Sequence, residues 1–305
     1  MVSIIIPCYN YGSYLREAID SISQQTYFEW ECIIVDNGST DNTSQIAMQA
    51  AKVDKRFQYL YQAKNSISAA RNKGIEAARG EYIQFLDADD MLATAKIELQ
   101  VAFLETSPEV DIIYSDVRFF DNENRSHLAV NYNMTDEEWM PKVSGPGEAV
   151  LRHLVAGNIM VMNAPLIRAR LVAKVQGFDT SLKVMEDWYF WIACALAGAC
   201  FHYDGRPAAY ALVRTHRSSI SKNRMQMYVY EGLIRRRYLA ASPDAVVRQL
   251  NAEKLTRLNE YLAVSFAEHK QPVKSALYFL YAARSSRAYT YYLKSSFLWL
   301  RKALS

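Results

Sequence analysis

The stretch that decides the fold is residues 83–90, Ile-Gln-Phe-Leu-Asp-Ala-Asp-Asp. Its apolar half reads as a buried strand, and the strand ends in three carboxylates. Asp87 and Asp89 are two positions apart, so on an extended segment both side chains are expected to point to the same side. Ligands of open α/β sheets bind outside the carboxyl ends of the strands. The stretch therefore predicts a ligand site at a sheet edge.

Two carboxylates on one side of a strand repel each other unless a cation lies between them. The simplest cation is Mg²⁺ or Mn²⁺, which takes oxygen ligands and is usually completed by substrate phosphates. The alternative is a strand followed by a polar turn, with Asp90 near the start of the next helix. The residues alone leave both interpretations open.

Three further strands are expected before this one, and helical patterns separate them. The predicted strands are residues 1–7, 31–35, 57–61 and 81–86. Apolar residues between positions 14 and 22 recur at helical spacing, and residues 68–78 form an Ala-rich helical segment. This alternation predicts an α/β fold with a mainly parallel sheet covered by helices on both faces.

Turn and cap residues mark the ends of these elements. Gly38 suits a tight turn after the second strand, and Asp41 or Asn42 suits the N-cap of the helix that follows. Gly80 is expected at the C′ position of the helix over residues 68–78. Polar residues follow successive strands at Asn10, Asp36 and Asp87, which predicts a nucleotide site along this edge.

Five motifs in this order resemble the family-2 glycosyltransferases with the GT-A fold. They are Pro-Cys-Tyr-Asn, Val-Asp-Asn-Gly-Ser-Thr-Asp, Ala-Arg-Asn-Lys-Gly-Ile, Leu-Asp-Ala-Asp-Asp, and Gly-Phe-Asp followed by Glu-Asp-Trp. Each motif alone is weak, but their shared order and spacing are specific. The resemblance covers roughly residues 1–220, with one departure at Asn37, where many relatives carry a second Asp. Residues 121–165 and 225–305 match no motif.

The resemblance implies a site for a nucleotide sugar and a divalent metal. It makes Asp89 the metal ligand and places Asp87 near the ribose and the metal. His216, in the segment over residues 214–221, is a candidate further contact to the metal or the diphosphate, although a lone His is more often structural. The residues implied in donor binding are Pro7, Tyr9, Asn10, Asp36, Arg71, Asn72, Asp87 and Ala88. For Arg71 and Asn72 the alternative is a solvated helix surface.

A second acidic landmark is Glu186-Asp187, which opens an aromatic helix over residues 188–197. Carboxylates at a helix N-terminus are stabilised by the helix dipole, so simple capping is one interpretation. In the resembling family this pair carries the catalytic base, and Asp187 is favoured over Glu186. One base on the face opposite the leaving group implies a single displacement with inversion, as in inverting glycosidases.

Composition places limits on the class of protein. Half of the 305 residues are hydrophobic, and the net charge of +3 is too small to indicate nucleic-acid binding. Four cysteines show no paired or zinc-like spacing and are interpreted as reduced thiols of a cytosolic protein. Pro7 interrupts the first apolar run, which argues against a signal peptide. The longest apolar run, residues 191–201, is too short to span a bilayer.

The C-terminal tail is basic and aromatic. No acidic residue follows Glu268, whereas seven cations do: Lys270, Lys274, Arg284, Arg287, Lys294, Arg301 and Lys302. An apolar stripe is expected at Tyr289, Leu293, Phe297, Leu300 and Leu304. Such a helix can lie on an anionic membrane surface, or it can pack against the rest of the protein.

The sequence thus predicts a GT-A domain over residues 1–222 and a helical region over residues 223–305. The expected function is a cytosolic, membrane-peripheral, metal-dependent inverting glycosyltransferase. Its donor would be a nucleoside-diphosphate sugar, with UDP preferred, and its acceptor a glycan or lipid-linked hydroxyl in polysaccharide or lipopolysaccharide synthesis. Two alternatives are a non-catalytic nucleotide-binding or scaffold protein and an Asp-x-Asp phosphotransferase. In Asp-x-Asp phosphotransferases the motif is expected on the first strand, whereas here it follows the fourth predicted strand.

Overall fold

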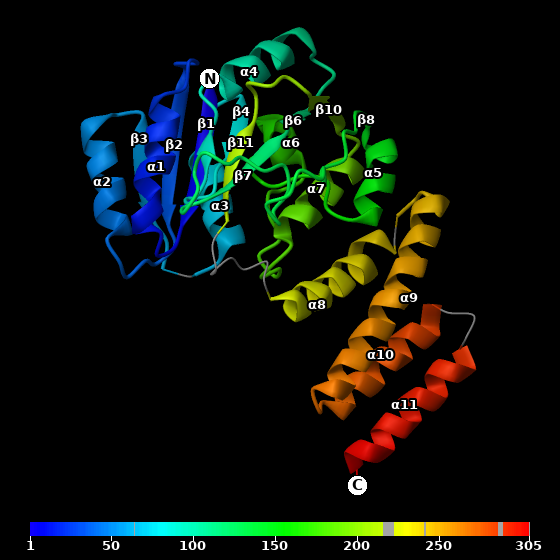
Figure 1. The fold of residues 1–305 in the computed structure, drawn as a ribbon. Helices are drawn as coiled ribbons and strands as arrows, with labels where there is room; N and C mark the ends of the chain where they lie inside the picture. The colour runs from blue at the N-terminus through cyan, green and yellow to red at the C-terminus, as the bar shows by residue number, and fades with distance from the viewer. Residues whose placement is uncertain (64, 216–222, 241, 286–288, 305) are drawn as a thin grey trace. The chain divides into compact units, whose positions relative to one another are not determined.

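The computed structural model describes residues 1–305 except 64, 216–222, 241, 286–288 and 305 (Figure 1). The chain forms two compact units. The first comprises Met1–Val150 and Asn158–Ser219, and the second comprises Leu151–Gly157 and Ile220–Ser305. The predicted boundary at residues 222 and 223 adjoins a segment outside the described residues. Nothing in the sequence had indicated that residues 151–157 group with the C-terminal helices.

An eight-stranded sheet forms the centre of the first unit. Its strands, in spatial order, are β3 (Phe57–Tyr61), β2 (Trp30–Asp36), β1 (Val2–Cys8), β4 (Tyr82–Phe85), β9 (Pro165–Arg168), β6 (Ile112–Ser115), β10 (Cys200–Asp204) and β8 (Gly145–Pro146). The first four run parallel. Strand β9 is antiparallel to both of its neighbours, and β10 runs parallel to β6.

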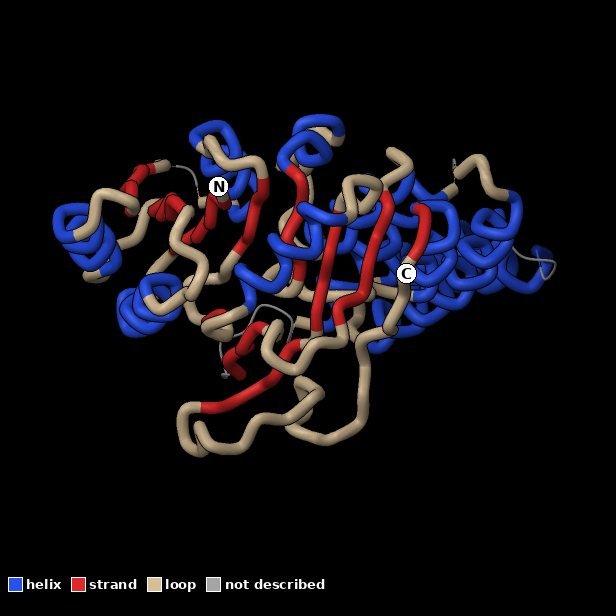
Figure 2. The backbone as a smooth tube through the Cα atoms, turned by 90° about the horizontal axis from the view of Figure 1, so that it is seen from above, coloured by secondary structure: helices blue, strands red, loops and turns tan. Residues whose placement is uncertain are grey.

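A smaller sheet contains β5 (Met91–Leu92), β11 (Ala211–Thr215) and β7 (Val117–Asp121). The helices that begin in the first unit are α1 (Gly12–Ser23), α2 (Thr43–Val53), α3 (Ile67–Ala77), α4 (Lys96–Thr106), α5 (Gly147–Ala156), α6 (Ala169–Lys174) and α7 (Glu186–Leu196). Figure 2 shows helices on both sides of the row of strands. The predicted α/β class with a mainly parallel sheet is confirmed.

The strands are apolar because both of their faces are covered. All seven residues of β1 and of β2 are buried, as expected for central strands of a sheet between two helical layers. Pro7 is tolerated in β1 because the pairing with β4 ends at Ile5. Proline has no N–H, and at this position no hydrogen bond to β4 requires one. Trp188 and Trp191 lie in the core.

The geometry expected after β4 is wrong in one respect. The chain does not stay extended through Asp89, because it turns at Ala88 and Asp89, and the Asp90 N–H donates to the Asp87 carbonyl at 3.1 Å. Asp90 also does not lie near a helix start. It is buried and leads into β5, and the next helix begins only at Lys96.

Helix α3 (Ile67–Ala77) matches the predicted segment to within one residue at each end, but its C-terminus is formed differently from the expectation. Ser66 caps its N-terminus by accepting from the Ala69 N–H, and the chain leaves the helix at Ala78 in an extended conformation. Gly80 is therefore not a C′ glycine, and its φ is not positive. A β-carbon there would lie 2.6 Å from the Ser3 backbone nitrogen, so the glycine permits close approach to β1.

Asp41 acts on two helices at once. One carboxylate oxygen accepts from the Thr43 N–H at 3.0 Å, in the first turn of α2, and the other accepts from the Gly12 N–H at 3.0 Å, at the start of α1. Asn42 occupies the N-cap position of α2 without a capping bond from its side chain. Asp41 therefore supplies the cap that the sequence assigned to either residue.

The second unit is helical. It contains α8 (Arg224–Ile234), a π-helical turn (Arg235–Leu239), α9 (Ala245–Glu268), α10 (Pro272–Ser285) and α11 (Tyr289–Leu304). Helix α10 lies against both α9 and α11 (Figure 1), and Leu262, Phe279 and Tyr292 are among the side chains of the shared core. None of the helices in the described part of the chain combines the length and apolar character needed to cross a bilayer.

The described side chains of the stripe expected on α11 are divided between two faces of the helix. Leu293 packs against the helical core, whereas Phe297 is 69% exposed. The packed face also includes Tyr292, Ser296 and Trp299, so it is rotated away from the predicted one. The side chains of Tyr289, Leu300 and Leu304 lie outside the described residues.

Candidate active site

The carboxyl ends of β2, β1 and β4 meet at one edge of the sheet. Cys8 at the end of β1 is the register partner of Asp36 at the end of β2. On the other side, the Leu86 N–H donates to the Ile5 carbonyl at 3.0 Å, which continues the pairing of β4. The polar turns after these three strands are therefore neighbours, as the sequence predicted.

The turn after β1 is joined to the turn after β2. Asn10 has a left-handed backbone, with φ of 57°, and its side-chain oxygen accepts from the Thr40 N–H at 2.7 Å. The Asn10 N–H donates to the Ser39 hydroxyl oxygen at 3.0 Å. These bonds fix the segment that carries Pro7 and Tyr9. The Tyr9 ring, 40% exposed, remains accessible to a ligand.

Asp36 is buried at this edge and organises the turn that follows it. One of its oxygens accepts from the Ser39 N–H at 2.8 Å, and the other accepts from the Tyr59 hydroxyl at 3.0 Å. Burial, followed by the bond to Asp36, raises the pKa of Tyr59 to about 12. The hydroxyl therefore stays protonated and keeps donating to Asp36.

The Asp87–Asp90 turn is held by Asn163, which lies in the turn before β9 and which the sequence did not single out. The Asn163 side-chain oxygen accepts from the Asp87 N–H at 2.9 Å, while its amide nitrogen donates to the Asp90 carboxylate. Burial, together with the negative charges of Asp89 and Asp87, raises the pKa of Asp90. Asp90 is thus a buried structural carboxyl, whereas Asp87 and Asp89 are half-buried at the edge.

The charge at this turn fits a divalent cation supported by a phosphorylated ligand. Asp87 and Asp89 also raise the pKa of the Tyr11 hydroxyl, after the larger contribution of burial, so their negative field reaches the β1 turn. Within the described residues, no group of three His, Cys, Asp or Glu side chains is arranged to hold a metal ion. Two carboxylates suit an ion such as Mg²⁺, which is typically bound by one or two carboxylates and completed by substrate phosphates.

Arg71 connects this turn to the second acidic landmark. From α3, its guanidinium donates to Asp87 at 3.0 Å and to Glu186 at 2.6 Å. Burial opposes its charge, but these two carboxylates raise the pKa of Arg71 above its ordinary value. Its side chain is 2% exposed, so the geometry favours a positioning role over the predicted direct contact with a donor.

Asn72 also has a positioning role in this structure. Its amide nitrogen donates to the Phe178 carbonyl at 2.9 Å, and its oxygen accepts from the Phe178 N–H at 2.8 Å. Gly177 adopts φ of 72°, and a β-carbon there would lie 2.5 Å from the Asn72 oxygen. The Gly-Phe-Asp motif therefore docks on α3, and Asn72 is turned toward that loop instead of the predicted donor site.

Asp187 lies in the first turn of α7, beside the buried Glu186. Its carboxylate accepts from the Asn158 amide at 2.8 Å and from the Trp188 N–H at 2.7 Å. Burial and the adjacent negative charge of Glu186 raise the pKa of Asp187 to about 6. Such a carboxylate is largely ionised at neutral pH yet basic enough to accept a proton, as a general base requires.

Several site residues could not be found from motifs. Asn158 and Asn163 lie in or beside loops where no motif was recognised, and only their partners reveal their roles. His216 lies outside the described residues. Ala88 lies in the turn, and the residue as a whole is only 2% exposed.

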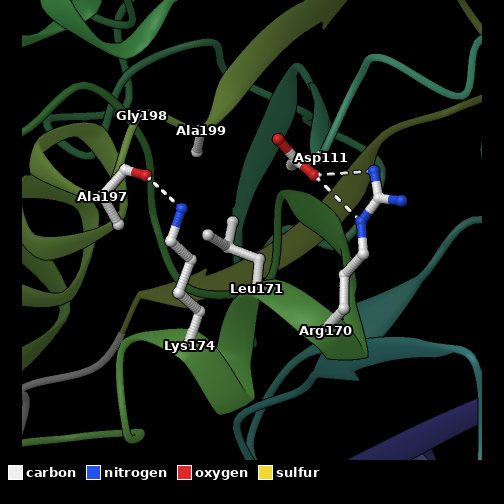
Figure 3. Close-up of a pocket in the computed structure, with 7 residues that line it drawn as sticks. All are labelled: Asp111, Arg170, Leu171, Lys174, Ala197, Gly198 and Ala199. Carbon is white, nitrogen blue, oxygen red and sulfur yellow. Dashed lines mark hydrogen bonds and ion pairs between the residues drawn. The ribbon is translucent and has the colours of Figure 1, made fainter.

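A separate cavity lies elsewhere in the first unit. It measures about 290 Å³ and is lined by Asp111, Arg170, Leu171, Lys174, Ala197, Gly198 and Ala199 (Figure 3). Lys174 donates to the Ala197 carbonyl at 2.7 Å, and Arg170 pairs with Asp111 at 3.0 Å. Asp111 precedes β6, so this cavity lies at the sheet edge opposite Asp87 and is separate from the candidate site.

Comparison with known sequences identifies relatives of this chain. The profile of the family described as Glycosyl transferase family 2 matches residues 3–169. The putative teichuronic acid biosynthesis glycosyltransferase TuaG of Bacillus subtilis is 43% identical over 105 residues, or 34% of this chain and 42% of TuaG. The uncharacterized glycosyltransferase MJ1057 of Methanocaldococcus jannaschii is 30% identical over 197 residues, 64% of each protein. The chain therefore spans less than two thirds of the length of either relative.

Solved structures share the fold. TarS 1–349 of S. aureus in complex with UDP-GlcNAc has a TM-score of 0.68 and 19% identity, covering 93% of this chain and 82% of TarS 1–349. The mannosyltransferase PcManGT of Pyrobaculum calidifontis, in complex with GDP-Man and Mn²⁺, has a TM-score of 0.61 and 16% identity, covering 99% and 86%. These similarities confirm the predicted fold class, GT-A with C-terminal helices.

The Arg71 ion pairs predict a large effect on stability. Arg71→Met should lower the free energy of unfolding of the first unit by roughly 3–5 kcal/mol, because it leaves the buried Glu186 carboxylate without its cation. Urea unfolding followed by tryptophan fluorescence measures this, since four of the five tryptophans, at positions 30, 139, 188 and 191, lie in that unit.

The matched control is Lys142→Met, which removes the cation of the exposed Lys142–Glu138 pair. It should change the unfolding midpoint little, because exposed pairs are screened by solvent. Adding Glu186→Gln to Arg71→Met should recover part of the loss. If Arg71→Met and Lys142→Met unfold at the same urea concentration, the buried bridge does not stabilise the site.

Proposed function

Because the chain belongs to glycosyl transferase family 2, we propose that it transfers a sugar from a nucleoside-diphosphate sugar to an acceptor hydroxyl with inversion. One observation carries this proposal. A single buried arginine joins the carboxylate turn at the nucleotide edge to the helix start that presents Asp187. Donor chemistry and base chemistry are thereby brought to one site.

The donor site would lie across the turns after β1, β2 and β4. Tyr9 would border the base, Asp36 would accept from the base or ribose, and the main chain at Asn10 and Ala88 would line the nucleoside. A UDP-sugar is the preferred donor. The TarS complex with UDP-GlcNAc supports a uridine nucleotide, while the PcManGT complex with GDP-Man shows that the fold also accommodates guanosine.

A divalent cation, Mn²⁺ or Mg²⁺, would be held by Asp89 with Asp87 nearby, and His216 is proposed as a further contact. When bound, it would neutralise the charge that develops on the diphosphate leaving group, a contribution worth several kcal/mol. The surplus of carboxylates at this turn supports the assignment, as does the presence of Mn²⁺ in the PcManGT complex.

The chain's own residues would then move the proton. Asp187 takes the acceptor hydroxyl proton as the sugar carbon is attacked from the face opposite the diphosphate. The Asn158 amide donates to one oxygen of the Asp187 carboxylate, and this bond fixes the orientation of the carboxylate. Glu186 is tied to Arg71 and is not available as the base, which supports the preference for Asp187. One base and one displacement give inversion.

The acceptor would be a glycan or lipid-linked hydroxyl in polysaccharide or lipopolysaccharide synthesis. The likeness to TuaG, named for teichuronic acid biosynthesis, supports a polysaccharide product. We place the protein on the cytoplasmic side, peripheral to an anionic membrane. On α11, Tyr291, Phe297 and Leu298 are more than half exposed, and the cationic Arg301 is exposed on the same helix.

The two alternatives make different predictions for the same assay. A scaffold protein would bind a nucleotide sugar without transferring or hydrolysing it. An Asp-x-Asp phosphotransferase would release inorganic phosphate, although its motif belongs after the first strand and here follows β4. Release of free nucleoside diphosphate from the donor identifies a glycosyltransferase.

The pKa of Asp187 sets the expected pH dependence. Because the deprotonated carboxylate is the base, donor turnover should rise with pH up to about 6 and level off above it. Asp187→Asn should lose on the order of 10²–10⁴ in rate and retain nucleotide binding.

A second variant checks the assignment. Asn158→Leu removes a bond that lowers the Asp187 pKa, so the acidic limb should move to higher pH. The measurement is a pH profile of nucleoside diphosphate release. Near-normal turnover in Asp187→Asn would place the base elsewhere.

The metal assignment predicts a selective loss of binding. Asp89→Asn should abolish the gain in UDP affinity that Mn²⁺ provides, while the folded structure persists, because the side chain lies at the edge of the core. Calorimetry of UDP with and without Mn²⁺ tests this. The control is Asp136→Asn, at an exposed carboxylate of a loop. Equal enhancement by Mn²⁺ in Asp89→Asn and in the control would remove Asp89 as a ligand.

The membrane proposal is tested by substituting exposed side chains of α11. Deleting the tail before Gln271 is less suitable, because it would remove α10 and α11, which contribute to the packed helical core. Phe297→Ser combined with Leu298→Ser should weaken co-sedimentation with anionic vesicles. The control is Phe28→Ser, at a ring of the first unit that is 76% exposed, compared with 69% for Phe297. Binding of the unaltered protein should fall as salt rises, since surface charges are screened. A protein that ignores anionic vesicles at low salt has no such anchor.

A further inference from the structure

Arg214, at the end of β11, is a buried cation for which the proposed reaction has no role. Its side chain has no exposed surface. Charged side chains are almost never fully buried unless they are paired. A position that retains an arginine in such surroundings must therefore use its charge or the geometry of its donors.

Arg214 holds the metal turn by both its main chain and its side chain. Its backbone N–H donates to the Asp90 carboxylate at 2.7 Å. Its Nε donates to the main-chain carbonyl of Asp89 at 2.8 Å. One residue from the smaller sheet thus binds both Asp89 and Asp90.

The rest of the guanidinium is immobilised by three other parts of the first unit. One terminal nitrogen donates to the Glu17 carboxylate of α1 at 2.9 Å, and the other donates to the Asn122 side chain, just beyond β7. The guanidinium carbon lies 4.9 Å from the centre of the Tyr14 ring and 4.6 Å from that of Phe120. The Arg214 guanidinium is thus hydrogen-bonded along its edge and packed between two aromatic rings, so it cannot rotate. The Asp89 carbonyl that it binds is therefore held in place as well.

We propose that Arg214 is a positioning residue that sets the main chain of Asp89 so that the Asp89 carboxylate meets a divalent cation. This inference rests on the proposed metal role of Asp89. The physical reason is that Asp89 lies in a turn, where rotation of one peptide would redirect its side chain. Groups that orient metal ligands commonly change metal affinity by 10–100-fold when they are removed.

Arg125 offers a matched comparison. Both of its terminal nitrogens donate to the same Glu17 carboxylate, at 2.9 and 3.0 Å. Its side chain is 54% exposed, and no hydrogen bond to Asp89 or Asp90 is found for it among the described residues. Arg125→Met therefore removes an arginine from Glu17 while leaving the metal turn in place.

The experiment measures two affinities for each variant: that of UDP without metal, and that of Mn²⁺ at saturating UDP, from the electron paramagnetic resonance signal of free Mn²⁺. Arg214→Met should weaken Mn²⁺ binding by about 10–100-fold and leave metal-free UDP binding unchanged. Arg214→Lys, whose single nitrogen cannot reach both Asp89 and Glu17, should also weaken it. Arg125→Met should match the unaltered protein.

Each other outcome decides against the inference in a recognisable way. Mn²⁺ binding by Arg214→Met that equals that of Arg125→Met, or an equal loss of UDP and Mn²⁺ affinity, would show that Arg214 only stabilises the fold. If Arg214→Met does not fold, Arg214→Lys and Glu17→Gln take its place under the same criteria. If the unaltered protein shows no Mn²⁺ enhancement, or Asp89→Asn keeps it, the proposed metal role fails together with this inference.

Discussion

The guanidinium of Arg71 lies between the carboxylates of Asp87 and Glu186, and the arrangement of the site depends on it. Without this cation, a carboxylate at the end of β4 and a buried carboxylate at the start of α7 would have no common partner. Removing one partner of a buried ion pair is costly, because the remaining charge has lost its water. The pairing therefore links the turn after β4 to the helix that carries Asp187. Of the two acidic neighbours it engages Glu186, which supports the proposal that Asp187 is the base.

Helix α3 is built to hold this bridge. Three residues of its central turn have separate partners. Arg71 binds the two carboxylates, and Asn72 binds both main-chain groups of Phe178. Gly74 brings the helix close to Ile5 of β1. Behind them, the Phe178 ring stacks on Phe190 of α7 at 4.4 Å between ring centres and meets Phe85 of β4 edge-on at 5.2 Å. Apolar packing and ion pairing thus both connect β4 with α7, so the arrangement of the site does not depend on electrostatics alone.

The sequence predicted the first four strands and the polar edge because hydrophobic runs and turn residues are local signals. It could not show the turn at Ala88 and Asp89, because two carboxylates at this spacing fit an extended strand equally well. Arg71 and Asn72 were recognised by motif and assigned to the donor. Glu186, the partner of Arg71, and Phe178, the partner of Asn72, each lie more than a hundred residues further along the chain. No local sequence pattern predicts such a contact. Asn158, Asn163 and Arg214 were unassigned for the same reason, since an amide or a guanidinium acquires its role only from what the fold places beside it.

The central claim is that one site joins a metal-bound donor to the base Asp187. Diffraction from crystals grown with Mn²⁺ and a non-transferable UDP-sugar, recorded for anomalous scattering, tests it most directly. The account predicts a single anomalous peak at coordination distance from the Asp89 carboxylate, with the sugar's anomeric carbon directed toward Asp187 and the Arg71 bridge intact. A peak away from Asp89, or a sugar directed away from α7, would contradict it.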